Sequence, residues 1–215
     1  MKKKVTIIDF GSGNILSIRR AFEKWDVEVN ITNKKEKILS ASRLVLPGVG
    51  AFKNAIDKLN SKNIFEVISE IRSKEIPLLG ICLGMQLFFE ESEEFGKVKG
   101  LSLMEGTVKK LPVLSLNHKK LKIPSIGWYK LILEDKSFSF KENKFFKNFN
   151  NEDRFYFVHS YYANPKDKSL VLASYNFGDH LIPSIVAKNN IIGCQFHPEK
   201  SGLFGLNLIK NFMSL

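Results

Sequence analysis

A cysteine at a strand-to-helix turn is the residue of this sequence best suited to act as a nucleophile. The segment Gly80-Ile81-Cys82-Leu83-Gly84 follows the apolar run at 77–79 and opens a helical pattern. This Gly-x-nucleophile-x-Gly spacing is typical of an elbow, because glycines let the backbone turn sharply between strand and helix. The free N–H groups at the helix start favour thiolate over thiol. We predict that Cys82 is a nucleophile; alone, the motif would also suit a buried structural cysteine.

A second motif supplies a base and a carboxylate. His197-Pro198-Glu199 follows a short strand-like run over residues 191–196. Proline pushes the residue before it towards an extended conformation, and residues two apart in an extended segment project to the same side. Glu199 would therefore orient the His197 imidazole, and His197 would take the Cys82 proton and later donate one to a leaving group. Alone, this tripeptide would also suit a surface turn.

A glycine-rich turn could complete the site. Pro47-Gly48-Val49-Gly50 follows the strand-like run at 44–46, and its glycines permit close approach of the backbone to a ligand. One N–H of this turn, together with the N–H of Leu83, could hold the oxyanion of a tetrahedral intermediate. The alternative is an ordinary turn after a strand.

In this order, the three motifs resemble the class I (triad) glutamine amidotransferases. The resemblance narrows to the glutaminase subunits of imidazole glycerol phosphate synthases and covers almost the whole chain. The segments that carry it are Asp9-Phe10-Gly11-Ser12-Gly13-Asn14, Pro47-Gly48-Val49-Gly50-Ala51-Phe52, Phe157-Val158-His159-Ser160-Tyr161 and His197-Pro198-Glu199-Lys200-Ser201. The resemblance implies a three-layer α/β fold and hydrolysis of L-glutamine to L-glutamate and ammonia. It also implies a (β/α)8-barrel synthase partner that receives the ammonia for histidine biosynthesis.

The resemblance also implies roles for individual residues. Cys82 would be the nucleophile, His197 the base and Glu199 its orienter, with Val49 and Leu83 at the oxyanion. Five further positions would hold glutamine: Gly50, Gln86, Glu94, Ser160 and Tyr161. Three others would meet the synthase: Asn14, Trp128 and Lys200. Glu94 lies in the acidic run 91–94, which would equally suit a solvated helix end. Activity in this family is weak without the synthase, which suggests that the backbone at 48–50 flips between two states.

A histidine and an asparagine of the family pattern are missing from this chain. The histidine-pathway subunits usually read Pro-His-Met-Gly-Trp-Asn where this chain has Pro124-Ser125-Ile126-Gly127-Trp128-Tyr129. Relatives outside histidine synthesis supply ammonia to sugar amidotransferases that build acetamidino groups on surface polysaccharides or flagellar glycans, and they are the first alternative. A free-standing amidase and a non-catalytic scaffold are the others. An intact triad argues against the scaffold.

The alternation of strand-like and helical patterns predicts the architecture. Strand-like runs at 5–10, 27–31, 44–46 and 77–81 alternate with helical patterns that begin at residue 15 and cover 51–60, 63–73 and 83–91. Such alternation indicates βαβ units and a mainly parallel sheet with helices on both faces. Short β-like runs within 105–133 and 155–194 suggest an antiparallel extension, and 203–212 returns to helical spacing. We predict one domain over residues 1–215.

Composition narrows the class of protein. The 215 residues are 44% hydrophobic, enough for one domain with a core. Asp9 ends the first apolar run, so we expect the first strand of a cytoplasmic protein rather than a signal peptide, and no apolar run could span a membrane. The net charge of +11 has no accompanying nucleic-acid motif. It indicates a solvated surface, part of which could face an acidic partner or a phosphorylated substrate.

The remaining cysteine and histidines give little further chemistry. Cys194 is expected to be a small core residue, and two cysteines do not make a disulfide framework. His118 and His180 are isolated, whereas His159, beside Ser160, could brace a glutamine pocket. No His, Cys, Asp or Glu cluster has metal-ligand spacing, so we predict neither a metal nor another cofactor.

Overall fold

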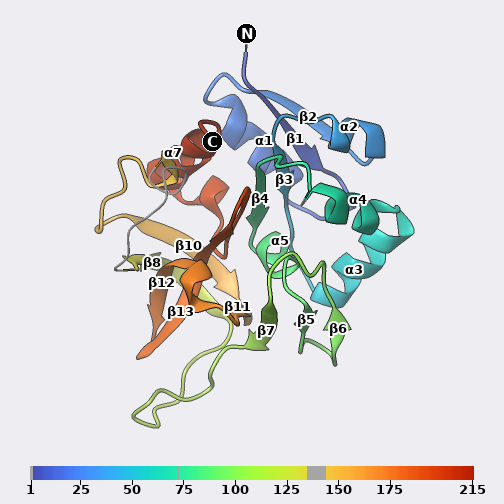
Figure 1. Ribbon diagram of the computed structural model, residues 1–215. Helices are drawn as coiled ribbons and strands as arrows, with labels where there is room; N and C mark the ends of the chain where they lie inside the picture. Colours follow the sequence, from blue (N-terminus) through green and yellow to red (C-terminus); the bar gives the residue numbers. More distant parts are fainter. Residues whose placement is uncertain (1, 72, 135–143) are drawn as a thin grey trace.

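A large mixed sheet forms the centre of the molecule. The computed structural model describes residues 2–71, 73–134 and 144–215. The sheet has eight strands in the order β2-β1-β3-β4-β14-β13-β12-β9 (Figure 1). Its parallel half contains β1 (Lys4–Ile8), β2 (Glu28–Thr32), β3 (Leu44–Leu46), β4 (Leu78–Ile81) and β14 (Ile191–Cys194). Its antiparallel half adds β13 (His180–Lys188), β12 (Val171–Phe177) and β9 (Ile132–Leu133).

Two smaller sheets flank the large one. In the first, β8 (Ser125–Lys130) pairs antiparallel with β10 (Arg154–His159). The second has the order β11-β7-β5-β6 and is built from β11 (Tyr161–Pro165), β7 (Gly106–Lys110), β5 (Glu91–Ser92) and β6 (Val98–Lys99). The antiparallel extension that the sequence predicts is therefore confirmed.

Helices cover both faces of the parallel strands. They are α1 (Ile15–Glu23), α2 (Lys35–Leu39), α3 (Phe52–Ser61), α4 (Ile64–Ile71), α5 (Leu83–Gln86) and α7 (Gly202–Phe212), with two 3₁₀ turns, η1 (Lys168–Leu170) and η2 (Pro198–Lys200). The helix predicted over 63–73 includes residue 72, which lies outside the described residues. No helix in the described ranges is long and apolar enough to cross a membrane.

The side chains of β1 alternate between two buried clusters, one on each face of the sheet. Val5 and Ile7 belong to one buried cluster together with Phe22 of α1 and Phe212 of α7. Ile8 belongs to a second cluster that contains the apolar residues of α3 and α4. Successive side chains of a strand point to opposite faces, so one strand supplies both cores. This arrangement confirms the predicted α/β architecture, with helices on both sides of the sheet.

The helix after the elbow is much shorter than the predicted 83–91. It ends at Gln86, and Glu91 already begins strand β5. The carbonyl groups that a longer helix would use internally accept hydrogen bonds from the segment 100–104 instead. Leu101 N–H donates to the Leu87 carbonyl, and Leu103 N–H donates to that of Phe88. These long-range bonds end the helix, and no local pattern announces them. The short helix α2 is also absent from the sequence prediction.

Two glycines let the elbow pack closely. A Cβ at Gly84 would lie 1.9 Å from the Leu46 carbonyl oxygen at the end of β3, and a Cβ at Gly80 would lie 2.5 Å from the Phe88 ring. The start of α5 therefore rests directly on the backbone at the end of the neighbouring strand. This contact brings the turn that follows Leu46 next to the turn that holds Cys82.

We expect Gly84→Ala to lower the free energy of unfolding by about 3 kcal/mol, because the new methyl group meets backbone that cannot move aside. Without that contact, alanine would stabilise a helical position by about 1 kcal/mol relative to glycine. Urea denaturation of the purified variants measures the difference.

Gly13→Ala is the control. A Cβ there would lie 3.2 Å from a methyl group of Val49, whose side chain is 40% exposed. Because this side chain can move aside, we expect a loss of no more than about 1 kcal/mol. Equal losses in the two variants would contradict the role of the Gly84 contact.

Candidate active site

The backbone at Cys82 is held in a strained turn. Its φ of 53° and ψ of −110° lie in a region that residues other than glycine rarely occupy. Cys82 N–H donates to the Cys194 carbonyl at 2.8 Å, and the Cys82 carbonyl accepts from the N–H groups of Met85 and Gln86. The turn is therefore tied to β14 on one side and to α5 on the other. Cys82 is only 7% exposed, and it lies in the wall of a cavity at the carboxyl end of β4.

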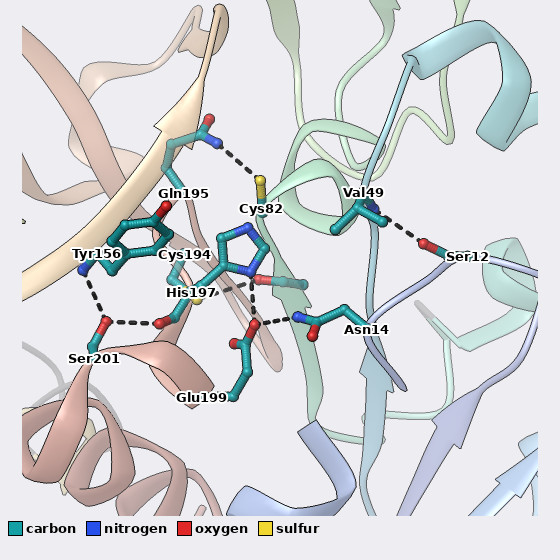
Figure 2. A network of polar contacts seen from close by, with 11 residues as sticks. Ser12, Asn14, Val49, Cys82, Tyr156, Cys194, Gln195, His197, Glu199 and Ser201 are labelled. Carbon is teal, nitrogen blue, oxygen red and sulfur yellow. Dashed lines mark hydrogen bonds and ion pairs between the residues drawn. The ribbon is translucent and has the colours of Figure 1, made fainter. Parts of the chain in front are cut away.

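His197 lies beside Cys82, and Glu199 lies on the far side of its imidazole, in the order that the sequence predicts (Figure 2). His197 Nδ1 is 2.7 Å from Glu199 Oε1, and the Glu199 side chain is fully buried. The imidazole lies next to the Cys82 side chain (Figure 2). One carboxylate oxygen thus orients the ring so that it can exchange a proton with the sulfur. The Cys-His-Glu triad expected from two separate motifs is assembled in the structure.

The backbone of His197 is attached to β10 through a serine. His197 N–H donates to the Tyr156 carbonyl at 2.9 Å. Ser201 Oγ donates to the His197 carbonyl at 2.7 Å and accepts from the Tyr156 N–H at 3.0 Å (Figure 2). These three bonds join η2 to the small sheet and hold the imidazole in place.

Opposing effects act on the charge of His197. Burial lowers the pKa of the imidazole, whereas hydrogen bonds and charges from Cys82 and Glu199 raise it, and the net result is a pKa of about 10. The environment therefore favours the imidazolium form of His197, which provides a proton for a leaving group.

Asn14 contacts the triad carboxylate. It precedes α1 in a left-handed conformation, with φ 71°, and its Nδ2 donates to Glu199 Oε1. The family resemblance suggested a place for Asn14 at a partner face, and no sequence pattern connected it with Glu199. The structure shows that this side chain shares an oxygen with His197 and so helps to orient the carboxylate.

A cavity of about 350 Å³ joins the predicted residues. It is lined by Cys82 and His197 of the triad, by the predicted oxyanion residues Val49 and Leu83, and by Gly50, Gln86, Glu94, Ser160 and Tyr161. Pro124, Val158 and His159 complete the wall. All five positions suggested to hold glutamine therefore border one cavity with the nucleophile, although they come from segments spread over more than half the chain.

Gln86 and Glu94 are held by other parts of the wall. Gln86 Nε2 donates to the Tyr161 carbonyl at 2.8 Å, which leaves its side-chain oxygen as the group able to accept from a ligand. Glu94 Oε2 accepts from Phe52 N–H at 2.7 Å at the start of α3. The run 91–94 is not a helix end, because Glu91 and Ser92 form strand β5.

One of the two predicted oxyanion donors is already occupied. Val49 N–H donates to Ser12 Oγ at 3.0 Å (Figure 2). Leu83 is the first residue of α5, where N–H groups lack an intrahelical acceptor. In this state Val49 cannot give the same hydrogen to an oxyanion, so the turn 47–50 must reorient before both donors can act together.

Trp128 and Lys200 form an exposed group around Tyr156. The Trp128 side chain is 48% exposed, and its ring centroid lies 5.7 Å from that of Tyr156. Lys200 Nζ lies 5.9 Å from the same Tyr156 ring. An aromatic ring and a cation at the surface next to the triad are suited to a protein interface.

Ser125 and Tyr129, which depart from the family pattern, point inwards from β8. Ser125 is 1% exposed and bonds to the Tyr175 hydroxyl at 3.1 Å. The Tyr129 ring packs edge-on against Phe157 at 5.6 Å and lies 4.9 Å from the Tyr175 ring. Ile126 and Trp128, on the outward side of the same strand, are 57% and 48% exposed. Ser125 and Tyr129 therefore alter the packing behind β8, whereas Ile126, in place of the family methionine, lies on its outward face.

Sequence reasoning missed one neighbour of the nucleophile. Gln195 Nε2 lies 3.7 Å from Cys82 Sγ (Figure 2). Gln195 precedes Phe196 in the run that leads to His197, and its position next to that motif is the only signal that could have drawn attention to it.

This chain is similar to known proteins over nearly its whole length. Residues 6–214 match the model of the family described as "Glutamine amidotransferase class-I". The chain is 40% identical over 211 residues to the imidazole glycerol phosphate synthase subunit HisH 1 of Legionella pneumophila (strain Lens), covering 98% of this chain and 99% of that one. It is 42% identical over 211 residues to the subunit HisH of Lactococcus lactis subsp. lactis (strain IL1403), covering 98% of each.

Solved structures show the same fold at lower identity. PurLQS from Thermotoga maritima superposes with a TM-score of 0.71 at 18% identity, over 100% of this chain and 99% of that one. A glutamine amidotransferase from Thermotoga maritima gives a TM-score of 0.64 at 20% identity, over 100% of this chain and 82% of the other. The three-layer architecture is therefore one that solved proteins of distant sequence also adopt.

We expect Asn14→Ala to slow alkylation of Cys82 by iodoacetamide about tenfold at neutral pH, because a hydrogen bond to a charged group is lost. The isolated chain is used, so that docking of another protein plays no part. Mass spectrometry of the Cys82 peptide gives the rate.

Asn30→Ala, at an exposed position of β2, is the control and should alkylate like the wild type. A wild-type rate for Asn14→Ala would show that the contact with Glu199 does not influence the triad.

Proposed function

Because this chain belongs to the class I glutamine amidotransferase family, we propose that it is the glutaminase subunit of an imidazole glycerol phosphate synthase. It hydrolyses L-glutamine to L-glutamate and ammonia, and the ammonia serves histidine biosynthesis. The observation that carries the proposal is the Cys82–His197–Glu199 arrangement at a cavity lined by all five suggested glutamine contacts. The 40% identity to a HisH subunit over nearly the whole chain supports the pathway.

The chemistry begins with transfer of the Cys82 thiol proton to His197. The thiolate attacks the carbon of the glutamine side-chain amide, and the carbonyl oxygen becomes an oxyanion. As the C–N bond breaks, His197 gives its proton to the nitrogen, and ammonia leaves. A water molecule then attacks the γ-glutamyl thioester, His197 takes a proton from it, and the thiolate departs to leave glutamate. Glu199 stabilises the imidazolium that forms in each half of the cycle.

The cavity supplies two side-chain oxygens that can accept hydrogen bonds from glutamine, one from Glu94 and one from Gln86. Glu94 has a second carboxylate oxygen that can bind the α-ammonium group, since its first binds the start of α3. The Gln86 side-chain oxygen accepts from the substrate, and Gly50, Ser160 and Tyr161 border the remaining space. This placement puts the side-chain amide of glutamine at the Cys82 end of the cavity.

The oxyanion is held by the N–H groups of Leu83 and Val49. Because Val49 donates to Ser12 in this structure, the chain on its own adopts a state of low activity. Release of the Val49 N–H from Ser12 and rotation of the backbone at 48–50 complete the oxyanion site. Binding of the synthase and its substrate favours the rotated state.

The partner is a (β/α)8-barrel synthase subunit that docks on the face of Asn14, Trp128 and Lys200, giving a cytoplasmic heterodimer. Two further large apolar side chains, Leu16 at 64% and Val49 at 40% exposure, belong to the segments beside the triad and suit the same interface. Part of the +11 charge of the chain favours an acidic surface on the barrel. The barrel leads the ammonia to a phosphoribosyl-carrying substrate.

We expect the purified chain to release glutamate from glutamine slowly alone, and at least tenfold faster with a barrel synthase from the same source and its ribonucleotide substrate. Coupled detection of glutamate measures both rates. Cys82→Ser is the control: it should retain the thermal stability of the wild type and lose turnover in the complex, since its hydroxyl is a much weaker nucleophile.

Other outcomes distinguish the alternatives. Fast turnover by the chain alone would indicate a free-standing amidase. A folded chain that the barrel synthase does not stimulate would contradict the histidine-pathway assignment and direct attention to sugar amidotransferases as partners. Normal turnover by the Cys82→Ser variant would overturn the mechanism.

We expect Ser12→Ala to raise glutamate release by the isolated chain severalfold, because Val49 N–H loses the acceptor that holds it away from the oxyanion. The stimulated rate of the complex should change little, since the rotated state does not use Ser12. Ser42→Ala, which removes a hydroxyl bonded to the Lys4 carbonyl, is the matched control and should leave both rates unchanged. A lower basal rate in Ser12→Ala would contradict the restraining role of the hydroxyl.

A further inference from the structure

In addition to His197, one other polar side chain lies close to the sulfur of Cys82. Gln195 is fully buried directly after β14, and its Nε2 lies 3.7 Å from Cys82 Sγ (Figure 2). Its Oε1 accepts from Gln86 Nε2 at 2.9 Å. The distance to sulfur is ordinary for an N–H donor and a large acceptor atom, provided that the amide nitrogen rather than the amide oxygen faces Cys82.

One backbone carbonyl determines which end of the amide faces the sulfur. The Tyr161 carbonyl oxygen can only accept, so the group of Gln86 that lies 2.8 Å from it must be the amide nitrogen. The same Gln86 nitrogen can only donate, so Gln195 must turn its oxygen towards Gln86. The Gln195 nitrogen is then the atom left to face Cys82.

A histidine that bonds to the same carbonyl is compatible with this orientation. His159 Nδ1 lies 2.9 Å from the Tyr161 oxygen and must carry a hydrogen, which leaves Nε2 to accept from the Tyr175 hydroxyl at 2.8 Å. Burial lowers the pKa of His159 to about 4, so the ring is neutral at pH 7. A single assignment of hydrogens therefore satisfies all the contacts that link Tyr175, His159, the Tyr161 carbonyl, Gln86, Gln195 and Cys82.

We propose that Gln195 is a further catalytic residue, whose side-chain N–H donates to Cys82 Sγ and stabilises the thiolate. The inference rests on the proposed glutaminase function and deepens it. Negative charge develops on Sγ twice in the cycle, before the attack on glutamine and again when the thioester is hydrolysed. Since Cys82 is only 7% exposed, water gives this charge little help, and a protein N–H must do so.

Two substitutions separate this role from that of a structural brace. Gln195→Met keeps the length of the side chain and removes both the oxygen and the nitrogen of the amide. Gln195→Glu keeps an oxygen for Gln86 to bind and puts a carboxylate oxygen in place of the donor that faces Cys82, which adds a negative charge when the group is ionised. Ser184→Ala is the control, because the Ser184 carbonyl accepts from Gln195 N–H at 2.8 Å while its hydroxyl bonds elsewhere, to the Ile182 carbonyl.

The first measurement is the rate of Cys82 alkylation by iodoacetamide as a function of pH, in the full chain without partner. We expect Gln195→Met to move the midpoint of the rate profile upwards by about one pH unit, since the thiolate loses a donor. Gln195→Glu should move it further, since its carboxylate also repels the thiolate. The second is glutamine turnover in the complex with the synthase, where kcat should fall about tenfold and KM should stay within twofold of the wild type. Ser184→Ala should match the wild type in both.

The proposal is overturned if Gln195→Glu behaves like the wild type in midpoint and kcat while Gln195→Met does not, because Gln195 would then serve only to hold Gln86. Wild-type behaviour of both variants would overturn it too. If Gln195→Met fails to fold, Gln195→Glu carries the test alone. Alkylation needs no glutaminase activity, so a wild-type complex that fails to hydrolyse glutamine would count against the proposed function and leave the alkylation test of Gln195 valid.

Discussion

The contact between the start of α5 and the end of β3 is the constraint on which the site depends. Only glycine at position 84 lets the helix backbone approach the Leu46 carbonyl, and this approach holds Cys82 in a conformation that its side chain would otherwise disfavour. It also brings the turn at 47–50 next to the nucleophile. The nucleophile and an oxyanion donor thus arise from one packing contact between two neighbouring parallel strands.

Burial strengthens the electrostatic interaction between His197 and Glu199. His197 and Glu199 have almost no exposed side-chain surface, so the imidazolium and the carboxylate interact in a medium that screens them weakly. Such a pair is costly unless each charge has hydrogen-bond partners. Asn14 supplies one to Glu199, and the attachment of His197 to β10 through Ser201 prevents the ring from turning away.

The structure combines a fully assembled proton-transfer pair with an unfinished oxyanion site. The triad is hydrogen-bonded, yet Val49 N–H is held by Ser12. This combination suits an enzyme whose product would be wasted without an acceptor. A small rotation of a glycine-flanked peptide is enough to switch it, because Gly48 and Gly50 on either side of Val49 lack side chains that would resist the change. On the proposed function, regulation would act on the oxyanion site rather than on the nucleophile.

The sequence by itself determined the parallel half of the fold and the identity of the triad. Strands and helices can be recognised from the local periodicity of apolar residues. The nucleophile elbow and the His-Pro-Glu tripeptide can be recognised because each lies within a few consecutive residues. Tertiary structure alone decided that α5 ends at Gln86, that Asn14 meets Glu199 and that Gln195 faces Cys82. These outcomes depend on hydrogen bonds between segments far apart in the chain. The position of such partners follows from how sheets and turns pack, and no local spacing records it.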